Sequence, residues 1–453
     1  MSYLLLLLYT ALILLFIYYS KFYQSAILPK NIVASIFILK FIGGVIVYIV
    51  YTKYYGGRST SDIFKYFDDG NIIYSSLWQN PVDYFRMVTG IGGDAPHLIK
   101  YYDTCGSWIK NFNYGLFNDN RTVIRFNAVA RLFSLGNIHI HTLFMSFISF
   151  TGLWGIYKLF EHKLLEANYP ANNIYKPTTS NSADYNTKNG FTIQKWLLPI
   201  VVFFFPSVYF WTSGILKEGI LMFAFGMLLY HFFQLLESPQ KTKHIIWIGI
   251  AAPLLLISKF YILVAALPGL LFVLIIRYWG KKHFTFKLIS VLLLFFVLSW
   301  FSKPIIGVSF PDILANKQND FVTYTDSLNY VGSKIEIPML KPNLKSILIN
   351  SPSAFFRTLF RPSVFEISNL MSFMAAFENL IIALLLIVMA LLFTTKNIKN
   401  EWLWFCVLFV VILFTLSGLT TPVLGALVRY KAPALPFLGI AVMFLVNFER
   451  LKI

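Results

Sequence analysis

Long apolar runs, separated by polar segments of different lengths, recur from one end of the chain to the other. A membrane-spanning helix needs about 20 consecutive apolar residues, and on this basis we predict about eleven spans. They cover residues 2–19, 31–51, 139–159, 196–212, 215–236, 244–258, 260–277, 286–302, 371–393, 401–417 and 433–448. Lys259 separates the sixth span from the seventh in otherwise continuous apolar sequence. The pattern predicts an all-α polytopic integral membrane protein.

Composition agrees with this class. The 453 residues are 57% hydrophobic and 13% charged. The net charge of +18 could indicate a nucleic-acid partner in a soluble protein. Here the charges lie between apolar runs, where they set topology and meet anionic headgroups, so we expect no nucleic acid and do expect membrane lipids as partners. The two cysteines suggest neither a disulfide framework nor a metal-ligand pair.

The short loops indicate sidedness, because their Lys and Arg residues prefer the cytoplasm. Those residues fall on one side: Lys241, Lys243, Arg277, Lys281, Lys282, Lys287, Lys396, Lys399, Arg450 and Lys452. The N-terminus is then outside and the C-terminus cytoplasmic, and the run 2–19 is expected to be a retained helix rather than a signal peptide.

This topology divides the chain into five segments. Residues 1–51 hold the first two spans, 52–138 an outer loop, 139–302 spans three to eight, 303–370 a second outer loop and 371–453 the last three spans. The polar cytoplasmic insert 161–195 has the composition of a flexible linker.

The first outer loop opens on a carboxylate-rich stretch, residues 54–70. Ser59, Thr60 and Ser61 are helix-start signals and Gly70 is a stop signal, which predicts a short helix. Asp62, Tyr66 and Asp69 then share one face at i, i+4 and i+7. Asp68 and Asp69 would lie near the negative end of the helix, where carboxylates are unfavourable, so they are either solvated or present for chemistry.

Two amphipathic helices are expected in the outer headgroup plane. One covers residues 123–138. The other begins at Ser351 and Pro352 and stops at Pro362. Its Arg357 and Arg361, at i and i+4, could bind a phosphate together. Of the two possible roles, we prefer ordinary lipid-headgroup anchoring for Arg357 and a site role for Arg361.

Four cations lie on the outer side against the charge rule: Lys217, Lys259, Arg429 and Lys431. Such residues are usually retained for an anionic ligand, although Lys217 could pair with Glu218 and Lys431 could extend to the headgroups. Lys40 stands in the middle of the second span and requires a partner, for which Glu378 is a candidate.

Carboxylates and cations on one side of a membrane suit a transferase whose donor is a sugar on a lipid phosphate. A carboxylate would accept the acceptor's proton, with Asp62 the first choice and Asp69 the second. The donor phosphate would be bound by Arg361, Arg429, Lys259 and Lys217. Tyr66, Asp68, Asp94, Glu218 and Tyr261 would line the substrate. No metal ligand is assigned and the cofactor is unknown; a divalent cation held by Asp62, Asp69 and Asp94 is a further possibility.

Four short stretches carry a resemblance to a known family. They are Tyr54-Tyr55-Gly56-Gly57 with Asp62 and Tyr66, the run 205–218 ending in Lys217 and Glu218, Phe360-Arg361-Pro362, and Val428-Arg429-Tyr430-Lys431 with Pro433 and Pro436. Together they resemble the GT-C superfamily of polytopic glycosyltransferases of bacterial surface-glycan assembly.

The resemblance implies a GT-C-like bundle that transfers a sugar, with inversion, from a polyprenyl-phosphate-linked donor. The acceptor would be a glycan, a lipid or a protein at the outer face of the bacterial cytoplasmic membrane. The family's acidic residue often follows Gly-Gly directly, whereas here residues 58–61 intervene. Asp62, Asp68 and Asp69 therefore all stay open as the base.

Two other functions stay open. A polymerase or ligase of lipid-linked glycans, resembling O-antigen polymerases, would depend on Arg361 and Arg429 and not on Asp62. A non-enzymatic transporter or assembly scaffold would use intramembrane polar residues such as Lys40 and Glu378, and no internal repeat supports it.

Overall fold

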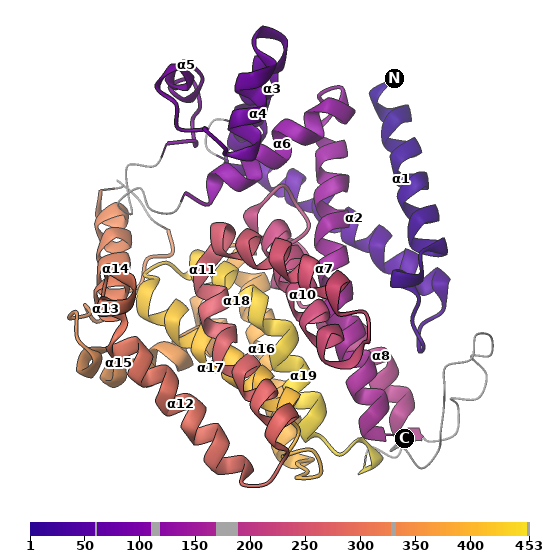
Figure 1. Ribbon diagram of the computed structural model, residues 1–453, viewed down its shortest axis with the longest axis vertical. Coiled ribbons are helices and arrows are strands. Elements are labelled where there is room, and N and C mark those ends of the chain that lie inside the picture. Colours follow the sequence, from indigo (N-terminus) through magenta and orange to yellow (C-terminus); the bar gives the residue numbers. More distant parts are fainter. Residues whose placement is uncertain (59–60, 110–117, 169–188, 328–331, 451–453) are drawn as a thin grey trace. The chain divides into compact units, whose positions relative to one another are not determined.

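The described residues form α-helices and short 3₁₀-helices joined by loops, with no β-strand among them (Figure 1). The computed structural model describes residues 1–58, 61–109, 118–168, 189–327 and 332–450. Ser59, Thr60 and the greater part of the predicted insert 161–195 lie outside these ranges. The predicted all-α class is confirmed.

Contacts group the chain into two compact units. The first comprises Met1–Leu165 and Tyr209–Phe260. It holds α1 (Ser2–Tyr19), η1 (Lys21–Tyr23), α2 (Lys30–Lys53), α3 (Asp62–Gln79), α4 (Pro81–Thr89), η2 (Pro96–Leu98), α5 (Ile99–Tyr102), α6 (Asn120–Ser134), most of α7 (Ile138–Asn168), α10 (Lys217–Glu237) and the first half of α11 (Lys241–Trp279).

The second unit comprises Glu166–Val208 and Tyr261–Ile453. It holds α8 (Asn189–Phe203), the rest of α11, α12 (Phe284–Trp300), α13 (Ser302–Ile306), α14 (Phe310–Asp326), α15 (Leu344–Phe360), η4 (Val364–Glu366), α16 (Leu370–Leu391), α17 (Glu401–Thr420), α18 (Leu424–Lys431), η5 (Ala432–Ala434), α19 (Leu435–Leu445) and η6 (Phe448–Arg450). The chain passes between the units within α7, within α9 (Pro206–Trp211) and within α11. The division into five segments of spans and outer loops stays a prediction.

Among the described residues, eight helical segments are long and apolar enough to cross a membrane: α1, α2, α7, α10, α11, α16, α17 and the segment Leu424–Leu445. The other predicted spans differ in form. Residues 196–212 divide into α8 and α9, residues 244–258 and 260–277 both belong to α11, and residues 286–302 form the shorter α12. The polytopic membrane class is confirmed, whereas the number eleven stays a prediction.

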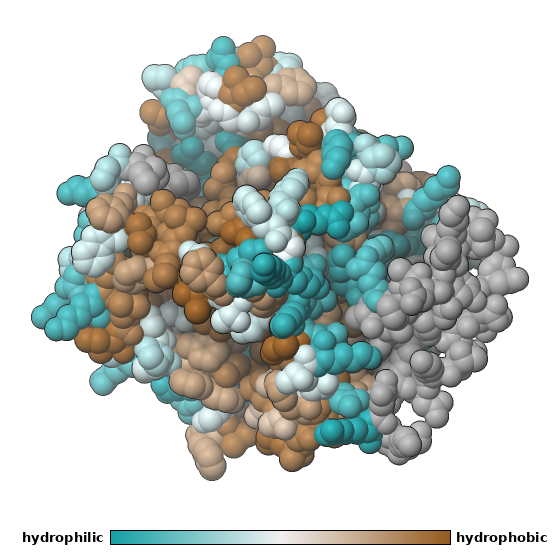
Figure 2. Space-filling model, turned by 60° about the horizontal axis from the view of Figure 1, so that its bottom comes forward, coloured by the Kyte–Doolittle hydropathy of each residue, from teal (hydrophilic) through white to brown (hydrophobic). Residues whose placement is uncertain are grey.

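The surface agrees with a membrane environment. Figure 2 shows hydrophobic residues over much of the face in view. In α1 the one buried residue is Ile17, and Leu4, Leu7, Leu8 and Leu12 are exposed. Apolar surface of this extent is unusual on soluble monomers and is stable when lipid covers it.

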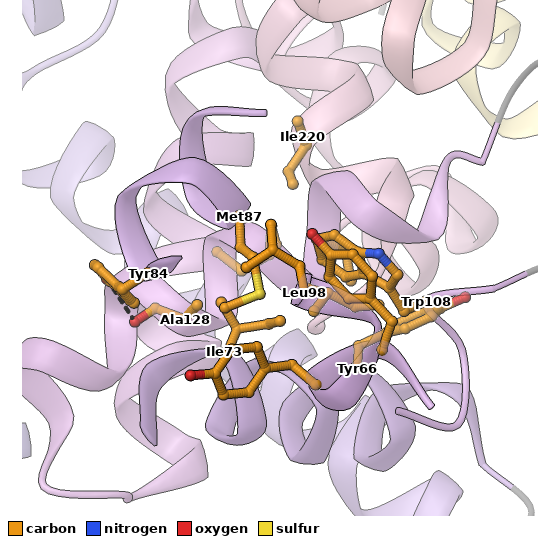
Figure 3. Close-up of a cluster of buried hydrophobic side chains, with 13 residues drawn as sticks. Tyr66, Ile73, Tyr84, Met87, Leu98, Trp108, Ala128 and Ile220 are labelled. Atoms are coloured by element: carbon orange, nitrogen blue, oxygen red, sulfur yellow. Dashed lines mark hydrogen bonds between the residues drawn. The ribbon is translucent and has the colours of Figure 1, made fainter. Parts of the chain in front are cut away.

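The 52–138 segment contains helices that pack around their own core (Figure 3). Trp108 is fully buried there, and Ile73, Met87 and Leu98 pack with it. Ile220 of α10 belongs to the same core, which joins this segment to a membrane helix. The expected helix over residues 123–138 is present as α6, with bounds Asn120–Ser134.

The predicted helix end at Gly70 is wrong, because α3 continues to Gln79. A Cβ atom on Gly70 would lie 2.5 Å from the Asn127 Cβ and 3.1 Å from the Ala128 nitrogen of α6. The glycine therefore permits close helix packing, which offsets the roughly 1 kcal/mol that glycine costs in a helix interior. Asp69 consequently lies mid-helix and not at a negative helix end.

The predicted helix start at Ser351 and Pro352 is also wrong. α15 begins at Leu344, with Pro352 inside it, because the Asn343 side chain caps the helix by accepting from the Ser346 amide at 2.8 Å. The expected stop before Pro362 is confirmed, since α15 ends at Phe360.

Close packing on α17 accompanies this longer helix. The Thr358 hydroxyl donates to the Phe414 carbonyl at 2.8 Å. A Cβ on Gly418 would lie 2.1 Å from the Ala354 carbonyl oxygen, so the two backbones nearly touch. α15 is therefore held by protein contacts on one side and is not solely a headgroup anchor.

We expect Gly226→Ala to lower the free energy of unfolding by about 1–3 kcal/mol, the usual effect of overpacking. A Cβ on Gly226 of α10 would lie 1.9 Å from the Gly152 carbonyl oxygen of α7. Denaturant unfolding of the detergent-purified protein measures the loss. Gly249→Ala is the matched control, because a Cβ there meets no atom within 4 Å. Equal losses in the two variants would contradict this account of the α7–α10 packing.

Candidate functional site

Lys217 is the first residue of α10, after a non-helical stretch that follows Trp211. A cation is unfavourable at the positive end of a helix, so it needs an anionic partner. Its Nζ lies 2.9 Å from the Asp119 Oδ1, and their side chains are 12% and 21% exposed. The same Nζ lies 5.7 Å from the Tyr66 ring centroid, which makes a cation–π contact. Lys217, Asp119 and Tyr66 are the centre of what we call the Lys217 cluster, with Asn120 and Asp69 as its supports.

Hydrogen bonds fix the position of Tyr66. Its buried hydroxyl donates to the Asn120 Oδ1 at 3.1 Å. The Asn120 amide nitrogen in turn donates to the Ser107 carbonyl at 3.0 Å. The ring that Lys217 contacts is therefore held by α3, α6 and the 103–109 loop together.

Asp69, one turn of α3 beyond Tyr66, fastens the same loop. Its two carboxylate oxygens accept from the Gly106 amide at 2.8 Å and from the Ser107 amide at 2.7 Å. Burial raises the pKa of the Asp69 carboxyl, and the two amide hydrogen bonds partly offset that rise. A carboxyl with a raised pKa suits proton transfer near neutral pH, yet both oxygens are already bound to the backbone.

Glu218, the next residue of α10, pairs with Lys259. The Lys259 Nζ lies 3.2 Å from the Glu218 Oε1, and the side chains are only 7% and 1% exposed. Lys259 has φ −157° and ψ 87° within α11, so the helix is interrupted where this cation sits. The expected pairing of Lys217 with Glu218 is replaced by two separate pairs, because neighbouring residues of a helix do not face each other.

The other acidic residues predicted for the site occupy different places. Asp62 is half-buried at the first position of α3. Asp68 forms an ion pair with Arg58 whose side chains are 39% and 63% exposed. Asp94 pairs with Arg121 at 3.1 Å and its side chain is 84% exposed.

The structure does not support the Asp62, Asp69 and Asp94 cation site. The described residues contain no group of three or more His, Cys, Asp or Glu side chains that could hold a metal ion. Asp69 turns both oxygens to backbone amides, and the exposed Asp94 carboxylate pairs with Arg121.

The remaining predicted site residues, Tyr261, Arg361 and Arg429, belong to the second unit. The Lys317 Nζ lies 4.3 Å from the Tyr261 ring centroid. Arg429 is half-buried in the last turn of α18. Arg361 lies just beyond α15 and forms two hydrogen bonds to Glu366, of which the Nε one measures 2.7 Å.

Arg357 and Arg361 each bond to other groups of the protein. The Arg357 guanidinium donates to the Gly418 carbonyl at 3.3 Å and to the Ser353 hydroxyl at 3.2 Å. Arg361 caps the helix, since its amide donates to the Arg357 carbonyl at 3.0 Å, and its side chain pairs with Glu366. Burial, and after it the charge of Arg361, lowers the pKa of the Arg357 guanidinium, and a joint grip on a phosphate stays a prediction.

The expected partner of Lys40 is also different. Lys40 is 1% exposed and donates to the Thr212 hydroxyl. Glu378 accepts from the Ser207 amide at 2.6 Å and from its hydroxyl at 2.8 Å, and Lys431 lies 3.7 Å away. Lys431 is fully buried, so it does not extend to the headgroups.

Sequence reasoning missed two residues of the Lys217 cluster, Asp119 and Asn120. Both stand where α6 begins, Asp119 as its N-cap residue. The available signal was a carboxylate and an amide directly before an amphipathic helix, which is a common place for capping residues. Nothing in the sequence spacing indicated that Asp119 pairs with Lys217 or that Asn120 bonds to Tyr66.

The fold and the site define a polytopic α-helical membrane protein with a charged cluster where α3, α6 and α10 meet. Comparisons with models of protein families, with curated proteins and with solved structures found no match to this chain.

We expect Lys259→Met to lower the free energy of unfolding by about 3–5 kcal/mol, because it removes the ammonium group that pairs with the buried Glu218 carboxylate. Lys334→Met is the matched control. It breaks the exposed Lys334–Asp326 pair, and exposed pairs contribute about 1 kcal/mol or less. Denaturant unfolding in detergent measures both, and a loss at Lys259 no larger than at Lys334 would show that Glu218 is not left uncompensated.

We expect the loop after α15 to loosen in acid. Hydrogen bonding from Arg361, above all, and the amide of Ser363 hold the pKa of Glu366 below its usual value. A lowered pKa contributes stability above the unfolded value of about 4.3, and this stability is lost as pH falls through the folded pKa. Hydrogen exchange of the Ser363 amide should therefore accelerate below about pH 4.3 relative to a Glu366→Gln variant. Identical pH profiles in the two proteins would refute it.

Proposed function

We propose that the protein is a membrane glycosyltransferase that moves a sugar from a polyprenyl-phosphate-linked donor to an acceptor. The Lys217 cluster carries the proposal. The cluster combines the Asp119 and Asp69 carboxylates of the 52–138 segment with the Lys217 ammonium group at the start of the apolar helix α10. The Lys217 and Asp119 side chains are partly exposed. Glycosyl transfer from a lipid phosphate needs these two kinds of group close to lipid.

The chemistry assigned to the cluster is a single displacement. The acceptor hydroxyl oxygen attacks the anomeric carbon, its proton passes to a carboxylate, and the bond from that carbon to the phosphate oxygen breaks with inversion. Lys217 stabilises the negative charge that develops on the departing phosphate. The acceptor is a glycan, a lipid or a protein.

The base is chosen among three carboxylates. Asp62 is half-buried and stands one helical turn before Tyr66, and Asp119 is partly exposed and paired with Lys217. Asp69 is bound to two backbone amides, which favours a positioning role for it. We therefore assign proton transfer to Asp62 or Asp119 and loop positioning to Asp69.

The proposed location is the bacterial cytoplasmic membrane, with the 52–138 segment and the N-terminus outside and the C-terminus cytoplasmic. The distribution of Lys and Arg in the short loops supports this orientation.

We expect Asp62→Asn or Asp119→Asn to lower the turnover of lipid-linked sugars in purified membranes by about 10²–10⁴-fold, the usual contribution of a general base. Lys217→Ala should lower it as well, because the departing phosphate loses its cation. Mass spectrometry of the lipid-linked sugar pool measures turnover. Asp326→Asn is the control, since it makes the same change in an exposed ion pair, the one with Lys334.

Full turnover in both Asp62→Asn and Asp119→Asn would overturn the general-base assignment. Loss confined to Arg361→Ala and Arg429→Ala would favour a polymerase or ligase of lipid-linked glycans. No turnover by the wild-type protein would favour a transporter or scaffold.

A further inference from the structure

A second polar arrangement lies within the 52–138 segment, around the turn Gly90-Ile91-Gly92-Gly93-Asp94. Gly90 and Gly92 have φ of 81° and 67°, a conformation that residues with side chains rarely adopt. The turn exposes backbone at Gly92 and Asp94, whereas the amides of Gly90, Ile91 and Gly93 donate to the Arg86 carbonyl, the Thr89 hydroxyl and the Gly90 carbonyl.

Three arginines border this turn. A Cβ on Gly90 would lie 2.9 Å from an Nη of Arg125, and one on Gly92 would lie 3.8 Å from the Arg86 Cδ. The third is Arg121, whose Nη1 lies 3.1 Å from Asp94. A short glycine-rich turn is thus surrounded by three cations.

Arg121 and Arg125 are held side by side. They stand one turn apart on α6, and their Cζ atoms lie 5.2 Å and 5.5 Å from the ring of Trp108. Tyr102 stacks on the same ring, at 4.8 Å and 11°. Burial lowers the pKa of the Arg125 guanidinium, and the charge of Arg121 lowers it further, so the two cations repel each other. The aromatic platform positions both guanidiniums despite this repulsion.

The negative charge opposite them is small. Asp94 pairs with Arg121, but its side chain is 84% exposed, where an ion pair contributes little. Arg125 donates to the Met87 carbonyl at 2.9 Å, and within the described part of the chain it forms no ion pair. Arg86 contacts the His97 ring at 3.4 Å, and the same ring nitrogen lies 2.9 Å from the buried Asp83 carboxylate, which offsets the charge of Arg86. The local charge is therefore positive, and it is concentrated on two guanidiniums with fixed planes.

We propose that the turn 90–94, Arg121 and Arg125 form a binding site for a phosphate or diphosphate group. Guanidinium groups bind phosphate oxygens through two parallel hydrogen bonds, and the glycines let the backbone approach the same oxygens. Arg121 exchanges the exposed Asp94 carboxylate for the phosphate. This inference does not rest on glycosyl transfer, because binding alone defines it.

The test uses the full chain in detergent and inorganic pyrophosphate as the probe, followed by isothermal titration calorimetry. We expect Arg125→Gln and Arg121→Gln each to raise the Kd by about tenfold or more, the usual effect of losing a hydrogen bond to a charged group. Asp94→Asn should lower the Kd, because it removes the carboxylate that competes for Arg121. Changes in Kd of opposite sign indicate a binding site, because all three substitutions would weaken pyrophosphate binding if these residues only held the turn in shape.

Arg58→Gln is the matched control, because it removes the same charge from the exposed pair with Asp68. Thermal unfolding identifies any variant that fails to fold. If an arginine variant does not fold, Asp94→Asn still tests the site, because it retains both arginines. The proposal is overturned if the wild type binds no pyrophosphate at millimolar concentration. It is also overturned if Arg121→Gln and Arg125→Gln bind like Arg58→Gln, or if Asp94→Asn weakens binding.

Two nanodisc compositions distinguish the sources of the phosphate. Weaker pyrophosphate binding in discs that contain phosphatidylglycerol than in discs of phosphatidylcholine alone would identify a lipid headgroup. Equal binding in both would identify a soluble phosphate. Either result supports the site.

Discussion

Backbone groups inside a membrane must be satisfied by the protein, because no water is present to do so. In this chain, several buried polar side chains bond to the backbone where the apolar helices are interrupted. The Ser146 hydroxyl donates to the Ser213 carbonyl at 2.7 Å, in the break between α9 and α10. The Asn379 side chain donates to the Pro362 carbonyl at 2.7 Å, just beyond α15. Glu378, next to Asn379, accepts from the Ser207 amide at the start of α9.

The same constraint places the charged residues of the first unit. Lys259 stands at the interruption of α11, and Lys217 and Glu218 stand at the start of α10. A helix end leaves backbone groups open, and the ionised side chains beside it need partners as well. The pairs Lys217–Asp119 and Lys259–Glu218 satisfy that need. Charges that a continuous apolar helix would exclude are thus tolerated at the ends and breaks.

Around the Lys217 cluster, the 52–138 segment supplies rigidity. Its core around Trp108 connects the loop that Asp69 holds with the helix that carries Asp119 (Figure 3). Gly70 allows α3 to lie against α6 without a side chain between them. A site built on packed helices keeps its groups in place better than one built on free loops.

The sequence by itself determined the membrane class and the all-α fold, because apolar runs of spanning length are a local property of the chain. It also predicted most long helices and the shared face of Tyr66 and Asp69, since helical periodicity is local too. Only the tertiary structure decided which cation meets which carboxylate. Lys217 and Asp119 are far apart in sequence, and no spacing rule joins them. Gly70 shows the same limit, because its role as a contact point and not a helix end depends on α6.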